Sequence, residues 1–188
     1  GRAARVHFLL REDGSFLNHG SYGACPRVVV EEQAGLRAQM EAHPDAFMAR
    51  MHPDRDIREP RRVARELAAF TGTHEDRIAL VENATTGVQA VLNSLPFGPG
   101  DHILVTDHQY NAVRLAVEAR CRDTGATPVV VRIPLPTDAD AIVERVLAAA
   151  DARVKLVVID HITSPSALVL PVERLVPELR RRGIPVLV

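Results

Sequence analysis

From about residue 60 onward the sequence alternates between two patterns, and this alternation constrains the fold more than any other feature. Segments with apolar residues at helical spacing alternate with short runs of β-branched and aliphatic residues that are bounded by Gly, Pro or Asp. Strands that alternate with helices form a parallel sheet, and the helices cover both of its faces. The sequence therefore predicts an α/β fold with a mostly parallel sheet and helices on both faces.

The predicted elements follow one another without a flexible linker. Strands are expected over residues 78–81, 102–105, 128–133, 155–159 and 184–188. Helices are expected over residues 60–70, 88–95, 111–122, 138–150 and 172–182. Gly72 follows the first of these helices, and Thr137 or Asp138 is expected to cap the fourth.

The first 59 residues show a different pattern. A polar, glycine-bearing stretch over residues 16–23 is followed by a helical pattern from about residue 28 to 40. We therefore expect an N-terminal arm and helix over residues 1–59 and an incomplete large domain over residues 60–188. Because the last apolar run would leave an unprotected sheet edge, we expect the natural chain to continue past Val188.

Charge and composition argue against several classes of partner. The 23 basic and 24 acidic residues give a net charge of -1, without a basic stripe that would attract nucleic acid. The longest apolar runs fall far short of the ~20 residues that cross a bilayer. Cys25 and Cys121 are too few for a disulfide framework and lack metal-ligand spacing. We expect a soluble, cytoplasmic protein without a metal site, a nucleic-acid partner or a membrane partner.

Three polar segments lie next to predicted strands. They cover residues 82–87, 107–111 and 160–166. Each follows a strand, and the carboxyl ends of parallel strands meet at one edge of a sheet, where ligands bind in such folds. The sequence therefore predicts a ligand cleft at this edge.

The chemistry of these segments suits a flat, phosphorylated ligand. Amides at a helix N-terminus and the hydroxyls of Thr85 and Thr86 favour a phosphate dianion. The alternative is that Thr85 or Thr86 only caps the helix. His108 or Tyr110 can stack on a heterocycle, although single rings in loops more often pack or lie at the surface.

Taken together, four segments resemble the class V aminotransferases, which are pyridoxal-phosphate (PLP) enzymes of fold type I. The segments cover residues 17–23, 82–87, 107–112 and 161–165, the last of which leads to 170–173. They look most like the isopenicillin N epimerase-like branch, with cysteine desulfurases and C–S lyases as more distant relatives. The resemblance covers nearly the whole chain as the N-terminal portion of such an enzyme, and it implies PLP as the cofactor.

The resemblance implies roles for particular residues. Ala84 and Thr85, with Thr86 beside them, would hold the PLP phosphate. An acidic residue followed by the ring-stacking histidine is the pattern of the desulfurases, so His108 is the first candidate to stack on the pyridine ring. Tyr110 is the second candidate.

Two further groups complete the implied site. Thr163 or Ser164 would donate a hydrogen bond to the phenolic oxygen of the cofactor. Asn18, His19 and Gly20 belong to a segment that resembles the arm lying over the substrate, which in this family is a small amino-acid-like molecule.

The resemblance also implies that essential groups lie beyond Val188. The aspartate at the pyridinium nitrogen, the Schiff-base lysine and the small C-terminal domain all come later in the family, so no catalytic residue is assigned and the fragment alone is expected to be inactive. Lys155 is the single lysine. It opens a strand and would lie roughly 15 Å from the cleft, at ~3.3 Å per residue, so we do not expect it to replace the family's lysine.

Different classes of function are consistent with these patterns. The first is a PLP-dependent enzyme of the epimerase, C–S lyase or desulfurase type that acts on an amino acid or related amine and is a homodimer when complete. The second is a non-catalytic α/β module that binds a phosphate or nucleotide, which the lack of a glycine-rich fingerprint disfavours. The third is one piece of a split enzyme.

Overall fold

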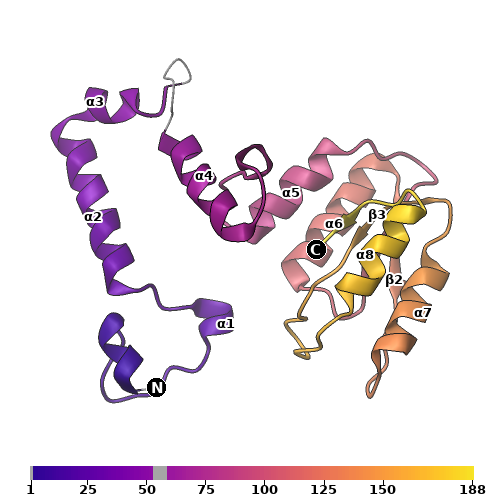
Figure 1. Cartoon of the computed structure of the whole chain (residues 1–188). Helices are drawn as coiled ribbons and strands as arrows, with labels where there is room; N and C mark the ends of the chain where they lie inside the picture. Colours follow the sequence, from indigo (N-terminus) through magenta and orange to yellow (C-terminus); the bar gives the residue numbers. More distant parts are fainter. Residues whose placement is uncertain (1, 53–58) are drawn as a thin grey trace. The chain divides into compact units, whose positions relative to one another are not determined.

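The computed structural model describes residues 2–52 and 59–188, which form two compact units (Figure 1). Unit 1 comprises Gly1–Leu80, and unit 2 comprises Val81–Val188. The predicted division of the whole protein after residue 59 stays a prediction.

Unit 2 is built on a four-stranded sheet with the order β2-β1-β3-β4. Its strands are β1 (His102–Thr106), β2 (Thr127–Val131), β3 (Val154–Val158) and β4 (Val186–Leu187). All three neighbouring pairs are parallel. The structure therefore confirms the predicted parallel sheet, and four of the five predicted strands lie within two or three residues of their expected bounds.

The four helices of unit 2 also follow the prediction. They are α5 (Ala84–Ser94), α6 (Asn111–Thr124), α7 (Ala139–Ala149) and α8 (Val172–Arg181). Asp138, one of the two expected caps, accepts a hydrogen bond from the amide of Ala141 at 2.8 Å. Gly125 ends α6 with a φ of 77°, a left-handed conformation that glycine adopts without strain.

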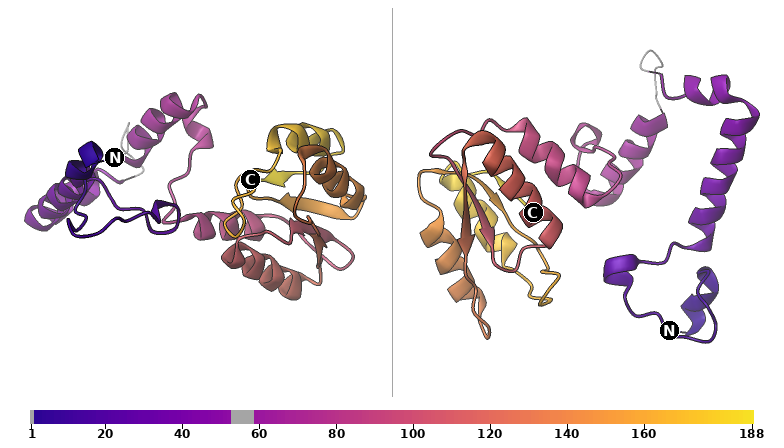
Figure 2. Two further views of the ribbon diagram at one scale, coloured as in Figure 1. Left: turned by 90° about the horizontal axis from the view of Figure 1, so that it is seen from below. Right: turned by 180° about the vertical axis from the view of Figure 1, so that it is seen from behind.

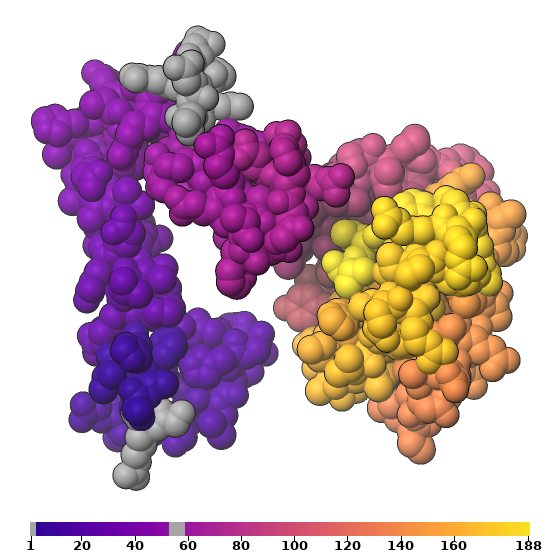
Figure 3. All heavy atoms as spheres, in the orientation of Figure 1, coloured from indigo at the N-terminus to yellow at the C-terminus, as the bar shows by residue number. Residues whose placement is uncertain are grey.

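Helices cover both faces of this sheet (Figure 2). On one face Ile103 and Val105 of β1 pack with buried residues of α5 and α6. On the other face Leu104 of β1 packs with buried residues of α7 and α8, which lie side by side (Figure 3). This alternation follows from the two-residue repeat of a strand, because successive side chains point to opposite faces. A strand buried on both faces has few positions that face solvent, which explains the apolar runs within β1 and β3.

The expected strand over residues 78–81 is wrong. Ile78 has extended backbone angles, but no described strand pairs with the segment. The side chains of Leu80 and Val81 are both 52% exposed. An apolar run forms a strand only where neighbouring backbone groups complete a ladder, and the described residues provide none here.

Unit 1 consists mainly of helices. They are η1 (Arg2–His7), α1 (His19–Tyr22), α2 (Arg27–Ala42), α3 (Pro44–Ala49), α4 (Glu59–Thr71) and η2 (Glu75–Arg77). The predicted helices over residues 28–40 and 60–70 are confirmed as α2 and α4. Gly72 follows α4 with a φ of 70°. Arg65 of α4 pairs with Glu75 of η2 at 2.5 Å, so charge as well as packing joins these two elements.

Candidate functional site at the carboxyl edge of the sheet

Asp160 joins the loops that follow β1 and β3. Its carboxylate accepts one hydrogen bond from Nε2 of Gln109 at 2.8 Å and another from the amide of Tyr110 at 3.0 Å. Burial raises the pKa of the Asp160 carboxyl above its usual range, and the two hydrogen bonds oppose that shift. Two of the three predicted polar segments are therefore brought together at one sheet edge.

His108 is held from two sides. Its Nε2 lies 2.8 Å from the carbonyl oxygen of Ile133, and its Nδ1 lies 2.7 Å from Oγ of Ser166. The neighbouring Asp107 accepts a hydrogen bond from the Ile133 amide at 3.0 Å, and its Oδ1 lies 3.8 Å from Nε2 of His108. The side chain of His108 is only 13% exposed, so the ring is fixed by protein contacts.

The ring of Tyr110, unlike that of His108, is not held by hydrogen bonds to the described residues. Its backbone is tied to Asp160, but its side chain is 49% exposed and makes no hydrogen bond to residues 2–52 or 59–188. Of the two candidates for stacking, His108 has a ring fixed by two hydrogen bonds, and Tyr110 has a half-exposed ring without a hydrogen bond to the described residues. The structure leaves the choice between them as a prediction.

Thr163 and Ser164 also differ in burial and in hydrogen bonding. Thr163 is buried, and its hydroxyl lies 2.8 Å from Oγ of Ser166 while accepting a hydrogen bond from the Leu168 amide at 2.9 Å. Ser164 is exposed, and its hydroxyl has no hydrogen-bond partner among the described residues. Ala167 closes this loop with a φ of 52°, a conformation that costs a residue with a Cβ about 1–2 kcal/mol.

The N-terminus of α5 offers free hydrogen-bond donors. Asn83 is the cap, because its Oδ1 accepts from the amide of Thr86 at 2.9 Å, and its carbonyl accepts from the amide of Gly87 at 3.1 Å. The amides of Ala84 and Thr85 make no hydrogen bond to any described residue. The sequence interpretation in which Thr85 or Thr86 only caps the helix is therefore wrong.

Two buried polar atoms at the end of β1 also lack partners within the described ranges. They are Oγ1 of Thr106 and Oε1 of Gln109, whose residues are 2% and 6% exposed. Buried polar atoms without partners are uncommon in proteins. Unsatisfied groups at this edge fit a site that receives a polar ligand or a further segment.

The three predicted arm residues belong to unit 1. Asn18 precedes α1, and its carbonyl accepts from the amide of Tyr22 at 3.0 Å. His19 lines a pocket of about 420 Å³, with its ring 4.8 Å from that of Phe16. Gly20 is exposed, and a Cβ atom added there would contact nothing within 4 Å. Their contact with a substrate stays a prediction.

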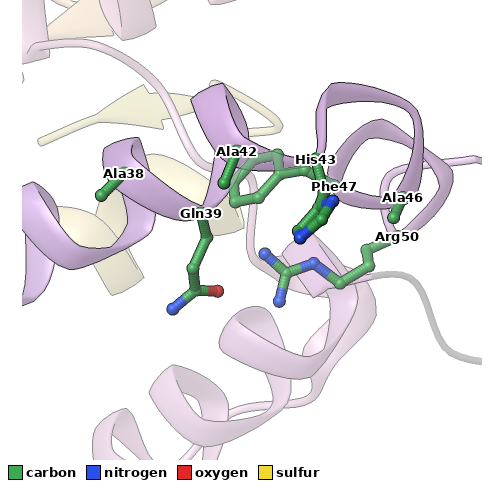
Figure 4. A pocket seen from close by; sticks show the side chains of 7 residues that line it. All are labelled: Ala38, Gln39, Ala42, His43, Ala46, Phe47 and Arg50. Carbon is green, nitrogen blue, oxygen red and sulfur yellow. The ribbon is translucent and has the colours of Figure 1, made fainter.

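A separate pocket lies against α2 and α3 of unit 1 (Figure 4). It has a volume of about 510 Å³ and contains none of the predicted site residues. The guanidinium of Arg50 lies 4.4 Å from the ring centre of Phe47 in its wall. Among the described residues, those that line this pocket carry no carboxylate, thiol or hydroxyl.

Other reactive groups lie away from the carboxyl edge. Lys155 is the second residue of β3, and its Nζ lies 3.9 Å from Oδ1 of Asp101, which precedes β1. It therefore lies at the amino edge of the sheet, as expected. Burial raises the pKa of the Cys121 thiol, which suits an unreactive core residue. Within the described ranges, no helix combines the length and apolar character of a membrane span.

Residues 24–188 match the family model described as Aminotransferase class-V. This match covers most of the chain, and the chain belongs to the class V aminotransferase family. The predicted family is thus confirmed.

Curated relatives are similar over nearly the whole chain. A putative L-cysteine desulfhydrase 1 from Oryza sativa subsp. japonica is 34% identical over 96% of this chain and 40% of its own length. An isopenicillin N epimerase from Streptomyces clavuligerus is 35% identical over 96% of this chain and 45% of its own length. The chain therefore spans less than half the length of these two relatives.

Solved structures confirm the fold class. A mutant of C-DES with glycine linked covalently to its PLP cofactor superposes with a TM-score of 0.78 at 21% identity, over 94% of this chain and 46% of that one. The cysteine desulfurase CsdA from Escherichia coli superposes with a TM-score of 0.76 at 18% identity, over 98% and 47%.

Four residues that position this site were not assigned a role from the sequence. They are Asn83, Gln109, Asp160 and Ser166. An asparagine just before a helical pattern is a recognised cap signal, so Asn83 was accessible to sequence reasoning. The other three act through contacts between segments about 50 residues apart, and a local pattern carries no signal for those.

Proposed function

We propose that this chain forms the N-terminal part of a PLP-dependent enzyme that acts on an amino acid or a related amine. The reaction belongs to the epimerase, C–S lyase or desulfurase type. The observation that carries this proposal is the pair of open amides at Ala84 and Thr85, in a chain of the class V aminotransferase family. An open helix N-terminus is an anion site, because its amides and the helix dipole both favour negative charge.

The residues present fit the cofactor. The amides of Ala84 and Thr85, with the hydroxyls of Thr85 and Thr86, would hold its phosphate. Neither hydroxyl makes a hydrogen bond to a described residue. His108 or Tyr110 would lie against its ring. Bound PLP supplies an electron sink for charge at the substrate α-carbon, while the protein orients the reacting groups.

The hydrogen bonds of the loop after β3 support one of the two candidates for the phenolic oxygen. The hydroxyl of Thr163 is engaged with Ser166 and Leu168, whereas that of Ser164 is exposed and free to donate. Ser164 is therefore the better donor to the cofactor. The predicted substrate contacts remain Asn18, His19 and Gly20.

The complete enzyme is further proposed to carry its lysine and its carboxylate clamp outside these residues and to act as a cytoplasmic homodimer. The names of the relatives support this range of reactions, since they include L-cysteine desulfhydrases and isopenicillin N epimerases.

The test is an absorption spectrum of the full-length protein titrated with PLP, before and after borohydride reduction. We expect a saturable visible band that reduction converts into a pyridoxyl group fixed on one lysine, which peptide mapping then locates. A protein that neither binds PLP nor retains a pyridoxyl group after reduction contradicts the proposal and favours the phosphate-binding module.

A further inference from the structure

The hydrogen bonds of His108 determine where its proton lies. The carbonyl oxygen of Ile133 can only accept, so Nε2 of His108, 2.8 Å away, must donate. In a neutral imidazole one nitrogen donates and the other accepts. Nδ1 is therefore the acceptor, and the hydroxyl of Ser166, 2.7 Å away, is its donor.

Thr163 sets the direction of the Ser166 hydroxyl. The amide of Leu168 donates to Oγ1 of Thr163 at 2.9 Å, and Oγ1 lies 2.8 Å from Oγ of Ser166. The Thr163 hydroxyl has two acceptors within reach, Oγ of Ser166 at 2.8 Å and the Leu168 carbonyl oxygen at 3.4 Å. Because the Ser166 proton is directed to His108 and the contact with Ser166 is the shorter, we assign the Thr163 proton to Ser166. The result is a directed relay from the Leu168 amide through Thr163 and Ser166 to Nδ1 of His108.

We propose that Thr163 and Ser166 are positioning residues that hold His108 as its neutral Nε2–H tautomer with both ring nitrogens occupied. This proposal rests on the proposed function, in which His108 is the first of two candidates to lie against the cofactor ring. A histidine with both nitrogens hydrogen-bonded has a fixed ring orientation and presents its ring face. The proposed contact of His108 with the heterocycle is therefore stacking of the ring face.

The relay has a second consequence for the loop after β3. His108 and Ser166 are 58 residues apart, so their hydrogen bond ties the ring to the loop that carries Ser164. The ring and the proposed donor to the phenolic oxygen are thus placed by one hydrogen-bonded unit. Loss of the Ser166 hydroxyl should therefore change the positions of both the His108 ring and Ser164.

Nuclear magnetic resonance tests the relay directly. The full-length protein is labelled with ¹⁵N-histidine, and the His108→Gln variant assigns the His108 signals in a long-range ¹H–¹⁵N correlation. We expect a protonated Nε2 and an unprotonated, hydrogen-bonded Nδ1 in the neutral form. In Ser166→Ala the Nδ1 resonance should move toward that of a free acceptor nitrogen, and Ser166→Thr should restore it. Ser94→Ala is the matched control, because the Ser94 hydroxyl donates only within α5.

PLP titration of the same proteins provides the second readout. Ser166→Ala should weaken PLP binding about fivefold, which corresponds to the loss of one net hydrogen bond of about 1 kcal/mol. A protonated Nδ1 in the neutral form, or an Nδ1 resonance unmoved by Ser166→Ala, overturns the relay. If Ser166→Ala does not fold, Ser166→Cys provides the same test, because it replaces the hydroxyl that donates to Nδ1 of His108 with the much weaker donor of a thiol. Wild-type protein that does not bind PLP contradicts the proposed function, while the resonances still report on the relay.

Discussion

The carboxylate of Asp160 accepts a hydrogen bond of 3.0 Å from the backbone amide of Tyr110, which lies 50 residues earlier in the sequence. The same carboxylate accepts a hydrogen bond from Nε2 of Gln109, a residue that is 6% exposed. This pair of bonds connects the end of β1 to the end of β3 beyond the last rung of their ladder. The site edge is thus held by a side chain where the backbone pairing stops.

Replacing Asp160 with alanine tests this connection. Both hydrogen bonds are lost and Gln109 keeps a buried donor without an acceptor, so we expect the free energy of unfolding to fall by about 2–3 kcal/mol. Urea denaturation measures the change. Asp140→Ala is the control, because Asp140 is exposed and its ion pair with Arg174 should contribute less than about 1 kcal/mol. Equal decreases in the free energy of unfolding of the two variants would contradict the role of Asp160 in connecting the ends of β1 and β3.

The pH dependence of stability should carry the signature of Asp160. Because burial raises its pKa in the folded state, the folded protein binds this proton more tightly than the unfolded chain does. Its contribution to stability is complete below the unfolded pKa, about 3.9, and is lost as pH rises through the higher folded pKa. The stability of wild type relative to Asp160→Asn should therefore decline from about pH 4 upward and then level off. Urea unfolding over a pH series measures this difference in the free energy of unfolding. An increase of the difference with rising pH would contradict a raised pKa of Asp160 in the folded state.

Ala167 offers a stabilising substitution. Its φ of 52° is costly for alanine and free of strain for glycine, while glycine loses more backbone entropy on folding. We expect Ala167→Gly to raise the free energy of unfolding by about 0.5–1 kcal/mol. Ala90→Gly, at an exposed position inside α5, should lower it by a similar amount. Thermal unfolding of both variants tests whether the two changes in the free energy of unfolding have opposite signs.

Lys155 should be dispensable for cofactor chemistry. It lies at the amino edge of the sheet and faces Asp101, away from the loops that carry His108 and Ser164. In the full-length protein, Lys155→Ala should keep the PLP band and the covalent pyridoxyl group after reduction. A variant that binds PLP but is no longer fixed by borohydride would show that this lysine reaches the cofactor.

The sequence predicted most of the fold because the two central strands, β1 and β3, are buried on both faces. Leu104 and its neighbours in β1 are apolar without interruption, and such runs mark a covered parallel strand. The run over residues 78–81 has the same composition but no ladder partner among the described residues, and composition carries no information about partners. Local patterns also placed the helices, since caps such as Asp138 act within one turn.

The site was predictable only in part. The positions of His108 and Thr163 at strand ends followed from the alternation of elements. Their partners did not, because the contact of His108 with Ser166 depends on the order of strands in the sheet. The sequence contains each residue, but the sheet order brings these loops together.

The proposed phosphate site at α5 is tested most directly by one substitution that removes a single amide. Ala84 is the first residue of α5, a position where proline is well tolerated, and Asn83 before it is already extended. Ala84→Pro in the full-length protein therefore deletes a donor while preserving the helix. Ala139→Pro, at the first residue of α7 after the extended Asp138, makes the same change away from the site. We expect Ala84→Pro to weaken PLP binding by about ten- to a hundredfold, the effect of one hydrogen bond to a charged group, and Ala139→Pro to leave it unchanged. Equal affinity in Ala84→Pro and wild type would contradict a phosphate site at the N-terminus of α5.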